Sequence, residues 1–313
     1  MEEIRYGRHV RDALTDHRPV VALESTLIAH GLPRPENLEA AREIEQTVRE
    51  HGAVPATIGM VGGEPVVGLD GDELARLATS DKVAKLSVRD LAPAAAAGVD
   101  GATTVASTVA LAAHAGIPLF ATGGLGGVHR SAAHAEADHT YDESADLMTL
   151  ARTPIAVVCA GVKSILDVGA TLERLETLGV TVVGYRTQRF PGFYLSDGGF
   201  DLDWSADTPE QLATLLRARQ AHGVHPGAVV VANPLPADLQ LDPALHDRVL
   251  ADALAGLERE AVTGKAVTPY LLAQFHEATG GASLEVNIRI VLRNAALAAQ
   301  IAVALAGHPV SSA

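Results

Sequence analysis

A lysine, Lys163, follows the most apolar predicted strand of the chain, in the segment IAVVCAGVKS (155–164). The chain has four lysines among its 24 basic residues, so it uses arginine almost everywhere else. A lysine beside apolar side chains loses solvation, which disfavours its charged form, whereas arginine keeps its proton in a protein. The lysine therefore favours nucleophilic amine chemistry, a carbinolamine or Schiff base with a sugar aldehyde. The alternative is a cation that binds a phosphate or pairs with a carboxylate.

Three further segments carry polar residues at or after the ends of predicted strands. Glu24 lies in VALESTLIAHG (21–31), Lys85 in VAKLSVRD (83–90) and His129 in the glycine-rich LFATGGLGGVHR (119–130). Open parallel sheets bind ligands outside the carboxyl ends of their strands, so these loops and Lys163 are expected to converge on one crevice. The glycine spacing does not fit the dinucleotide fingerprint, although its N–H groups can still hold a phosphate. A carboxylate at a helix N-terminus and a simple tight turn remain the alternatives.

An acidic run, HRSAAHAEADHTYDESADL (129–147), is a weak candidate for a metal site. It contains neither a thiolate cluster nor an HExxH motif, so zinc is disfavoured. Its carboxylates suit a hard cation such as Mg²⁺ or Mn²⁺ better. A solvated acidic loop is the alternative.

Predicted strands alternate with predicted helices along the chain. The apolar runs predict strands over 20–23, 56–61, 66–69, 117–124, 155–161 and 180–185. The periodic stretches predict helices over 36–50, 71–79, from 90, from 103 or 104 to 116, over 165–178, and in three late segments, 211–220, 244–264 and 283–307. This alternation predicts an α/β protein with a largely parallel central sheet covered by helices on both faces. With no repeat and no obvious linker, we expect one large domain over 1–313.

Composition limits the class of partner. The net charge of −14 disfavours nucleic acid and membrane surfaces but permits an anionic small ligand. The single cysteine, Cys159, cannot form an internal disulfide. The N-terminus lacks the apolar core of a signal peptide, and no uninterrupted apolar run is long enough to cross a bilayer. A cytoplasmic location is the expectation.

Eight blocks in order make the chain resemble the pseudouridine-5′-phosphate glycosidases, from about Val20 to Leu305. The blocks are VALESTLIAHGLPRPENLEAA, KLSVRDL, ATTVASTVALAAHAGIPLFATGGLGGVHR, HTYDESADLMTLARTPIAVVCAGVKSILD, YRTQRFPGFY, VANPLP, TPYLL and NIRIVLRNAALAAQIA. The resemblance implies an α/β/α sandwich that assembles as a homotrimer. It also implies reversible cleavage of pseudouridine 5′-phosphate, with water, to uracil and ribose 5-phosphate, in pseudouridine catabolism and with a divalent cation, typically Mn²⁺.

The same resemblance implies roles for individual residues. Glu24 matches the family's proton donor and Lys163 its covalent nucleophile. Asp142 matches the metal ligand. Substrate contacts are implied for Lys85, Thr104, Val105, Thr122, His129, Ser144, Ala145, Asp146 and Asn287. The chain departs from the family pattern at Val88, where a second arginine is usual, and in a lengthened loop at 131–139.

Two other functions use parts of the same pattern. A class I aldolase-like lyase would also form a Schiff base with a sugar phosphate, but it leaves Glu24 and the uracil without a role. A non-catalytic nucleotide-binding module would need the phosphate loop but would tolerate the loss of Lys163. Product analysis separates the first alternative, and turnover separates the second.

Overall fold

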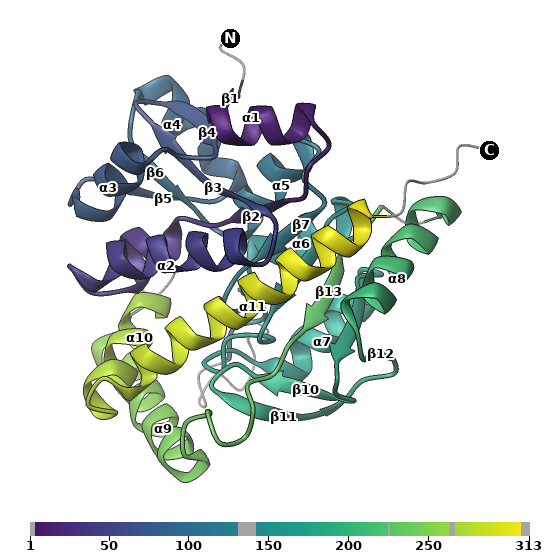
Figure 1. Cartoon of the computed structure of the whole chain (residues 1–313). Helices are drawn as coiled ribbons and strands as arrows, with labels where there is room; N and C mark the ends of the chain where they lie inside the picture. Colours follow the sequence, from purple (N-terminus) through teal and green to yellow (C-terminus); the bar gives the residue numbers. More distant parts are fainter. Residues whose placement is uncertain (1–3, 131–141, 225, 263–266, 308–313) are drawn as a thin grey trace.

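A nine-strand path forms the main sheet of the computed structural model, which describes residues 4–130, 142–224, 226–262 and 267–307 (Figure 1). Its strands lie in the order β1 (Arg5–Tyr6), β4 (Glu64–Val67), β3 (Val54–Val61), β2 (Val20–Leu23), β7 (Leu119–Ala121), β8 (Ala156–Cys159), β13 (Val229–Ala232), β9 (Thr181–Tyr185) and β12 (Ser205–Ala206). Every neighbouring pair along this path is parallel except β3 with β4. The largely parallel sheet predicted from the sequence is confirmed.

Alternate side chains of the central strands enter two separate cores. In β2, Ala22 packs into one core and Val21 into the other, and Val157 and Val158 of β8 divide in the same way. One core is covered by α1 (Arg8–Thr15), α5 (Val105–His114), α6 (Ala145–Arg152) and α7 (Val168–Thr177). The other is covered by α2 (Glu36–Glu50), α8 (Pro209–His222) and α11 (Ala282–Ala306). This three-layer arrangement is an α/β/α sandwich, as expected (Figure 1).

The strands β5 (Ala84–Leu86) and β6 (Gly101–Thr103) form a branch at the carboxyl end of β2. The first half of β3 pairs with β2, and β6 pairs antiparallel with β3 at Gly59 and Met60, beyond the last β2 pair. Because β5 is parallel to β6, both strands run against β2. Lys85 was expected at or after a strand and lies within β5. The strand is not parallel to β2, however, and β5 and β2 point their carboxyl ends toward one another.

The remaining elements lie around this sheet. The helices α3 (Gly71–Thr79) and α4 (Leu91–Ala97) accompany the β5–β6 branch, with a short helical turn, η2 (Val88–Asp90), before α4. A second turn, η1 (Leu27–Gly31), follows β2, and an antiparallel hairpin joins β10 (Arg189–Gly192) to β11 (Leu195–Asp201). The helices α9 (Pro243–Glu260) and α10 (Val267–Ala278) lie together near the start of α11 (Figure 1). Neither the hairpin nor α10 was predicted.

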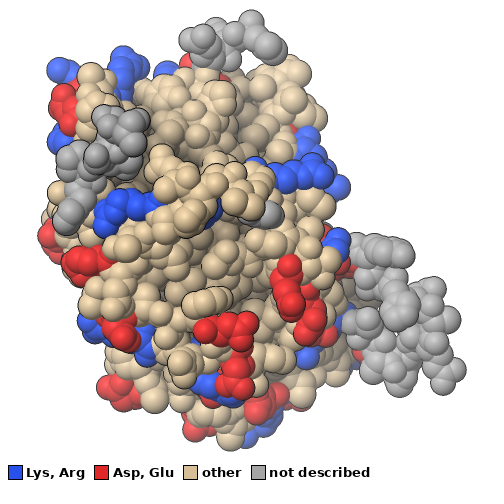
Figure 2. Space-filling model, turned by 90° about the vertical axis from the view of Figure 1, so that its right-hand side faces the viewer, with Lys and Arg blue, Asp and Glu red and all other residues tan. Residues whose placement is uncertain are grey.

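The helix α11 is long and apolar enough to cross a membrane by length and composition alone. Its buried residues, among them Ala295, Ala298 and Ile301, instead pack into the core shared with α2 and α8. It is therefore the core helix of the outer layer. Over the face in Figure 2, acidic and basic side chains are interspersed, with the acidic ones gathered mainly in the lower half.

Candidate active site

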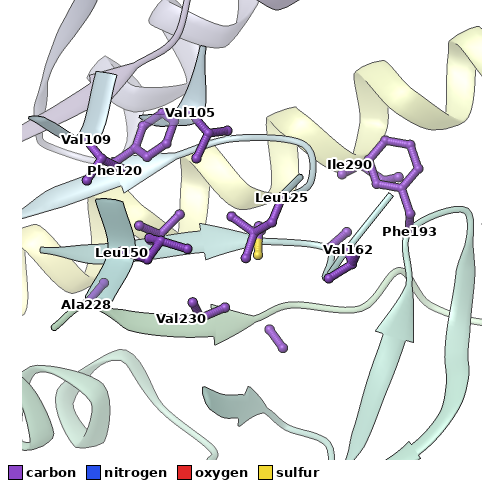
Figure 3. Close-up of a cluster of buried hydrophobic side chains, with 14 of the residues drawn as sticks. Val105, Val109, Phe120, Leu125, Leu150, Val162, Phe193, Ala228, Val230 and Ile290 are labelled. Atoms are coloured by element: carbon purple, nitrogen blue, oxygen red, sulfur yellow. The ribbon is translucent and has the colours of Figure 1, made fainter. Parts of the chain in front are cut away.

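Two loops at the carboxyl ends of β7 and β8 pair with each other and hold Lys163 between them. Leu125 N donates to Gly161 O at 2.9 Å, and Lys163 N donates to Leu125 O at 3.1 Å. The side chains of Leu125 and Val162 are buried, and Figure 3 shows them in the apolar cluster that also contains Phe193. The apolar residues of both loops thus anchor the backbone, and the ladder fixes the Cα of Lys163 at the edge of the core.

Glu24 directly follows β2 and receives a hydrogen bond from the hydroxyl of Thr122, at the end of β7. Burial raises the pKa of the Glu24 carboxyl above its usual range. Lys163, the Thr122 hydroxyl and Lys85 oppose this shift, whereas Asp146 adds to it. A carboxyl with a raised pKa keeps its proton at higher pH, so Glu24 is suited to act as a general acid.

Two adjoining cavities meet at Glu24, Thr26, Lys85 and Lys163. The outer cavity, of about 450 Å³, is lined among others by Thr104, Val105, His129, Asp142, Ser144, Ala145 and Asp146. The inner cavity is smaller and is lined among others by Thr122, Gly123, Phe193, Leu272 and Asn287. All twelve residues singled out from the sequence therefore line one cavity or both.

Asp146 holds the wall of the outer cavity together. Its two carboxylate oxygens accept from the backbone N–H groups of Ala106, at 3.0 Å, and Gly126, at 2.8 Å. These bonds join the first turn of α5 to the glycine-rich loop. Ser144 is the N-cap of α6 and accepts from Asp146 N at 3.2 Å. Asp146 therefore has a structural role that the sequence did not reveal, in addition to facing the cavity.

Thr104 lines the outer cavity, whereas Ser25, next to Glu24 in the chain, is buried and lines neither cavity. Thr104 is the N-cap residue of α5 but makes no side-chain capping hydrogen bond. Ser25 is fully buried: its Oγ donates to Ile58 O at 2.6 Å and accepts from Thr103 N at 2.9 Å. Ser25 thus ties β2 to the β5–β6 branch and has no free hydroxyl for catalysis.

Asn287 presents an unsatisfied acceptor to the inner cavity. The residue lies in the first turns of α11 and is 6 % exposed, and its Oδ1 has no hydrogen-bond partner among the residues that the structure describes. A buried amide oxygen without a partner costs free energy, so it is suited to receive an N–H donor from a ligand.

The structure provides one carboxylate, that of Asp142, for the predicted metal site. Asp142 has a half-exposed carboxylate at the outer cavity, and its Oδ2 lies 3.7 Å from His129 Nδ1. Within the described ranges, no three His, Cys, Asp or Glu residues gather as a metal site would require. His134 and His139 of the acidic run lie outside the described residues. One carboxylate fits a hard cation that keeps several water ligands, and it does not fit a closed zinc site.

Several residues of the two cavities were missed from the sequence. His30 lines the inner cavity at the end of η1, and burial lowers its pKa, helped by Lys85. Phe193, from the β10–β11 hairpin, forms another wall with a backbone φ of 63°, a strained conformation for a non-glycine residue. Arg89 lines the outer cavity. Each lies in a sequence block noted above, but only the fold shows that they face the ligand space.

The chain matches the family described as Indigoidine synthase A like protein over residues 9–304. Its relatives include a pseudouridine-5′-phosphate glycosidase from Salinispora tropica, 74 % identical over 97 % of this chain and 93 % of the relative. A protein of the same name from Frankia alni is 62 % identical over 95 % of this chain and 81 % of the relative.

Solved structures agree with these matches. The prealnumycin C-glycosynthase AlnA, in complex with ribulose 5-phosphate, superposes with a TM-score of 0.87 at 38 % identity, over 98 % of each chain. An indigoidine synthase A-like protein from Thermotoga maritima superposes with a TM-score of 0.85 at 33 % identity, over 97 % of this chain and 96 % of that one. The chain belongs to the indigoidine synthase A-like family, among the pseudouridine-5′-phosphate glycosidases.

Proposed function

We propose that the protein reversibly cleaves the carbon–carbon glycosidic bond of pseudouridine 5′-phosphate, giving uracil and ribose 5-phosphate in pseudouridine catabolism. The observation that carries this proposal is that Lys163, Glu24 and Asn287 line one cavity. They would supply an amine nucleophile, a proton donor and an acceptor for a base N–H. Two relatives that bear the name of this activity, at 74 % and 62 % identity, support the same substrate.

The bond to be broken explains why an amine is needed. In pseudouridine the base is joined to C1′ through carbon, so direct hydrolysis would have to expel a carbon leaving group without assistance. A nitrogen bound at C1′ provides a lone pair that can push the base away. Lysine supplies that nitrogen and forms a covalent intermediate that splits one difficult step into easier ones.

The proposed sequence begins with opening of the sugar ring. Glu24 gives a proton to the ring oxygen, the C1′–O bond breaks, and the neutral Nζ of Lys163 forms a bond to C1′. The new ammonium group returns a proton to the Glu24 carboxylate. Glu24 then protonates the base carbon, the C1′–C bond breaks, its electron pair restores the double bond of uracil, and the nitrogen lone pair forms C=N. Water adds to this imine, and collapse of the carbinolamine releases ribose 5-phosphate, the free lysine and protonated Glu24.

The outer cavity suits the phosphate end of the substrate. Lys85 and Arg89 bring positive charge to it, whereas the N–H groups of Ala106 and Gly126 in its wall already donate to Asp146. Binding of the phosphate there would orient C1′ toward Lys163 and would hold the covalent lysine–sugar adduct in place. The neighbouring AlnA structure was solved with a sugar phosphate, ribulose 5-phosphate.

A divalent cation, Mn²⁺ in the family resemblance, is proposed to bind at Asp142, with His129 beside it. When bound, the ion would neutralise negative charge on the phosphate. The homotrimer and the cytoplasmic location also stay proposals, supported by the resemblance and by the composition of the chain.

The decisive test compares the parent protein with Lys163→Arg. Parent protein, pseudouridine 5′-phosphate and Mn²⁺ should yield uracil. The arginine variant keeps the charge but cannot form the adduct, so it should bind the substrate and turn over about a thousandfold or more slowly. Incubation of the parent with ribose 5-phosphate and borohydride should add the mass of the reduced sugar phosphate at Lys163.

Each alternative predicts another result. Near-parental turnover by Lys163→Arg would disprove the covalent mechanism. An aldolase-like lyase would give other products from a sugar phosphate and no uracil. A non-catalytic nucleotide-binding module would bind pseudouridine 5′-phosphate without turnover.

A further inference from the structure

A chain of two buried asparagines lies behind the inner cavity. Asn294 of α11 is 1 % exposed, and its Nδ2 donates to the carbonyl oxygen of Thr122 at 2.7 Å. Its Oδ1 accepts from Asn233 Nδ2 at 2.9 Å, and the backbone N of Asn233 donates to Cys159 O at 2.8 Å. Neither asparagine is among the residues that line the two cavities. The chain therefore connects α11, the end of β13, and the end of β7 without touching the ligand space.

These bonds end on the residue that contacts the proton donor. Thr122 accepts from Asn294 through its backbone carbonyl and donates to Glu24 through its hydroxyl. Thr122 N is fixed as well, because it donates to Val158 O at 3.0 Å. With both backbone polar groups held, the side chain of Thr122 leaves the backbone in a defined direction.

The arrangement also satisfies a buried carbonyl group, because Thr122 is 1 % exposed and an apolar residue at position 294 would remove this bond to its carbonyl. A buried polar network is favourable only when every member is paired. Here the two asparagine side chains are paired to each other. Asn294 Nδ2 donates to the carbonyl of Thr122 at 2.7 Å and, more weakly, to that of Gly123 at 3.5 Å. The spacing of Asn287 and Asn294 also places them two turns apart on one face of α11. The helix thus presents one amide to the cavity and one to its support.

We propose that Asn294 is a positioning residue for the reaction. It holds the Thr122 peptide, and thereby aims the Thr122 hydroxyl at Glu24. The role rests on the proposed function, in which Glu24 donates the proton that opens the sugar ring.

A hydrogen bond to a carboxylate favours the ionised form. If the Thr122 hydroxyl no longer donates to Glu24, the titration of Glu24 should therefore move to higher pH. The other charged groups that act on Glu24 are Lys163, Asp146 and Lys85. Further titratable or charged residues that line the cavities are His30, Arg89, Asp90, His129, Asp142 and Glu143. None of these is altered by a substitution at position 294, so a shift would report on the Thr122 bond.

The test is a double-mutant cycle with Asn294→Ala and Thr122→Val in the full-length protein. Each single variant should lower kcat by about tenfold to a hundredfold, the loss expected from misplacement of a reacting group, and should change KM much less. Each should also move the alkaline limb of the kcat/KM profile to higher pH. The double variant should be no slower than Thr122→Val, because Asn294 acts through that hydroxyl. The proposal would be overturned if the kcat losses of the two single variants multiplied in the double variant, or if the single variants changed KM and left kcat unaltered.

A matched control separates positioning from loss of stability. Asn37 is also 1 % exposed, and its amide donates to the carbonyls of Ile28 and Ala78. Asn37→Ala should lower the melting temperature while leaving the alkaline limb in place. If Asn294→Ala does not fold, Asn233→Ala serves instead, because it removes the hydrogen-bond partner of Asn294. It should move the alkaline limb of the kcat/KM profile in the same direction by a smaller amount. An unmoved limb would refute the positioning role.

A second readout does not depend on catalysis. Infrared spectroscopy of the substrate-free protein, with Glu24→Gln to identify the band, follows the Glu24 carboxyl directly. The Asn294→Ala variant should titrate at higher pH than the parent, and an unchanged titration would refute the positioning role. If the parent protein releases no uracil from pseudouridine 5′-phosphate, only the proposed function is refuted. The infrared titration of Glu24 still decides whether Asn294 is a positioning residue.

Discussion

Replacing Glu24 by glutamine tests the proton donor with the smallest change of shape. Glutamine keeps the length of the side chain and an oxygen that can accept from the Thr122 hydroxyl. It removes only the transferable proton. We expect kcat/KM to fall by about 10²- to 10⁴-fold, the usual contribution of a general acid, which corresponds to about 3 to 5 kcal/mol. Uracil release, followed in a stopped assay, measures the loss.

The pH dependence of the parent provides a sharper signature. Burial raises the pKa of Glu24 above its usual range, against the opposing influence of Lys163. A proton donor works in its protonated form, so kcat/KM should fall as pH rises through the raised pKa. The fall should be about tenfold per pH unit, because the protonated fraction drops by that factor. The Glu24→Gln profile should lack this limb.

Stability should respond with a definite sign. Because the pKa of Glu24 is higher in the folded protein, the stabilisation that comes from its protonation is complete below the ordinary glutamate pKa and is lost as pH rises through the raised value. Glutamine does not titrate there. The melting temperature of Glu24→Gln should therefore rise relative to that of the parent as pH increases from the ordinary glutamate pKa to the raised value. The assignment of Glu24 as the proton donor would be refuted by two results together: a difference in melting temperature that is the same at low and high pH, and an alkaline limb of kcat/KM that persists in Glu24→Gln.

The remaining predictions concern the phosphate, the metal and the single thiol. The parent should prefer pseudouridine 5′-phosphate to pseudouridine, and Lys85→Met should reduce that preference by raising KM for the phosphorylated compound; equal kcat/KM for both substrates in the parent would contradict a phosphate site. Asp142→Ala should weaken the Mn²⁺ dependence of the rate while far-ultraviolet circular dichroism stays unchanged; an unaltered metal titration would show that another residue binds the ion. Burial raises the pKa of the Cys159 thiol to about 12, so a disulfide reagent at pH 8 should label it only after unfolding, and rapid labelling of the native protein would contradict its burial.

Local features of the sequence were sufficient for many of the elements. The helices over 36–50 and 71–79 have the predicted bounds. The second begins at a capping box in which Asp70 accepts from Glu73 N at 2.9 Å and Glu73 accepts from Asp70 N at 3.0 Å. The strands over 56–61 and 66–69 were also predicted. They form the β3–β4 hairpin, and Gly62 and Gly63 in its turn both take positive φ values. Such signals act within a few residues, so the chain carries them independently of the rest of the fold.

The order of strands could not be derived in this way. The sequence predicted the unit of β8, α7 and β9, but β13 lies between the two strands, with Val230 paired to both Val157 and Val182. Pairing of this kind depends on which distant apolar run fills the gap in the sheet. Short apolar runs such as VVVA resemble one another, so their local pattern cannot specify their neighbours.

By itself, the sequence determined which chemical groups are available: a rare lysine after an apolar strand, an acid after another, a glycine-rich loop, and the blocks that indicated the family. Only the tertiary structure decided how they act. It turned β5 against β2 so that Lys85 faces Glu24 from the opposite direction. It also brought Asn294 from the last helix to the carbonyl of Thr122, 172 residues earlier in the chain. The physical reason is that burial and hydrogen-bond direction are properties of packed neighbours, and those neighbours are chosen when the layers of the sandwich close.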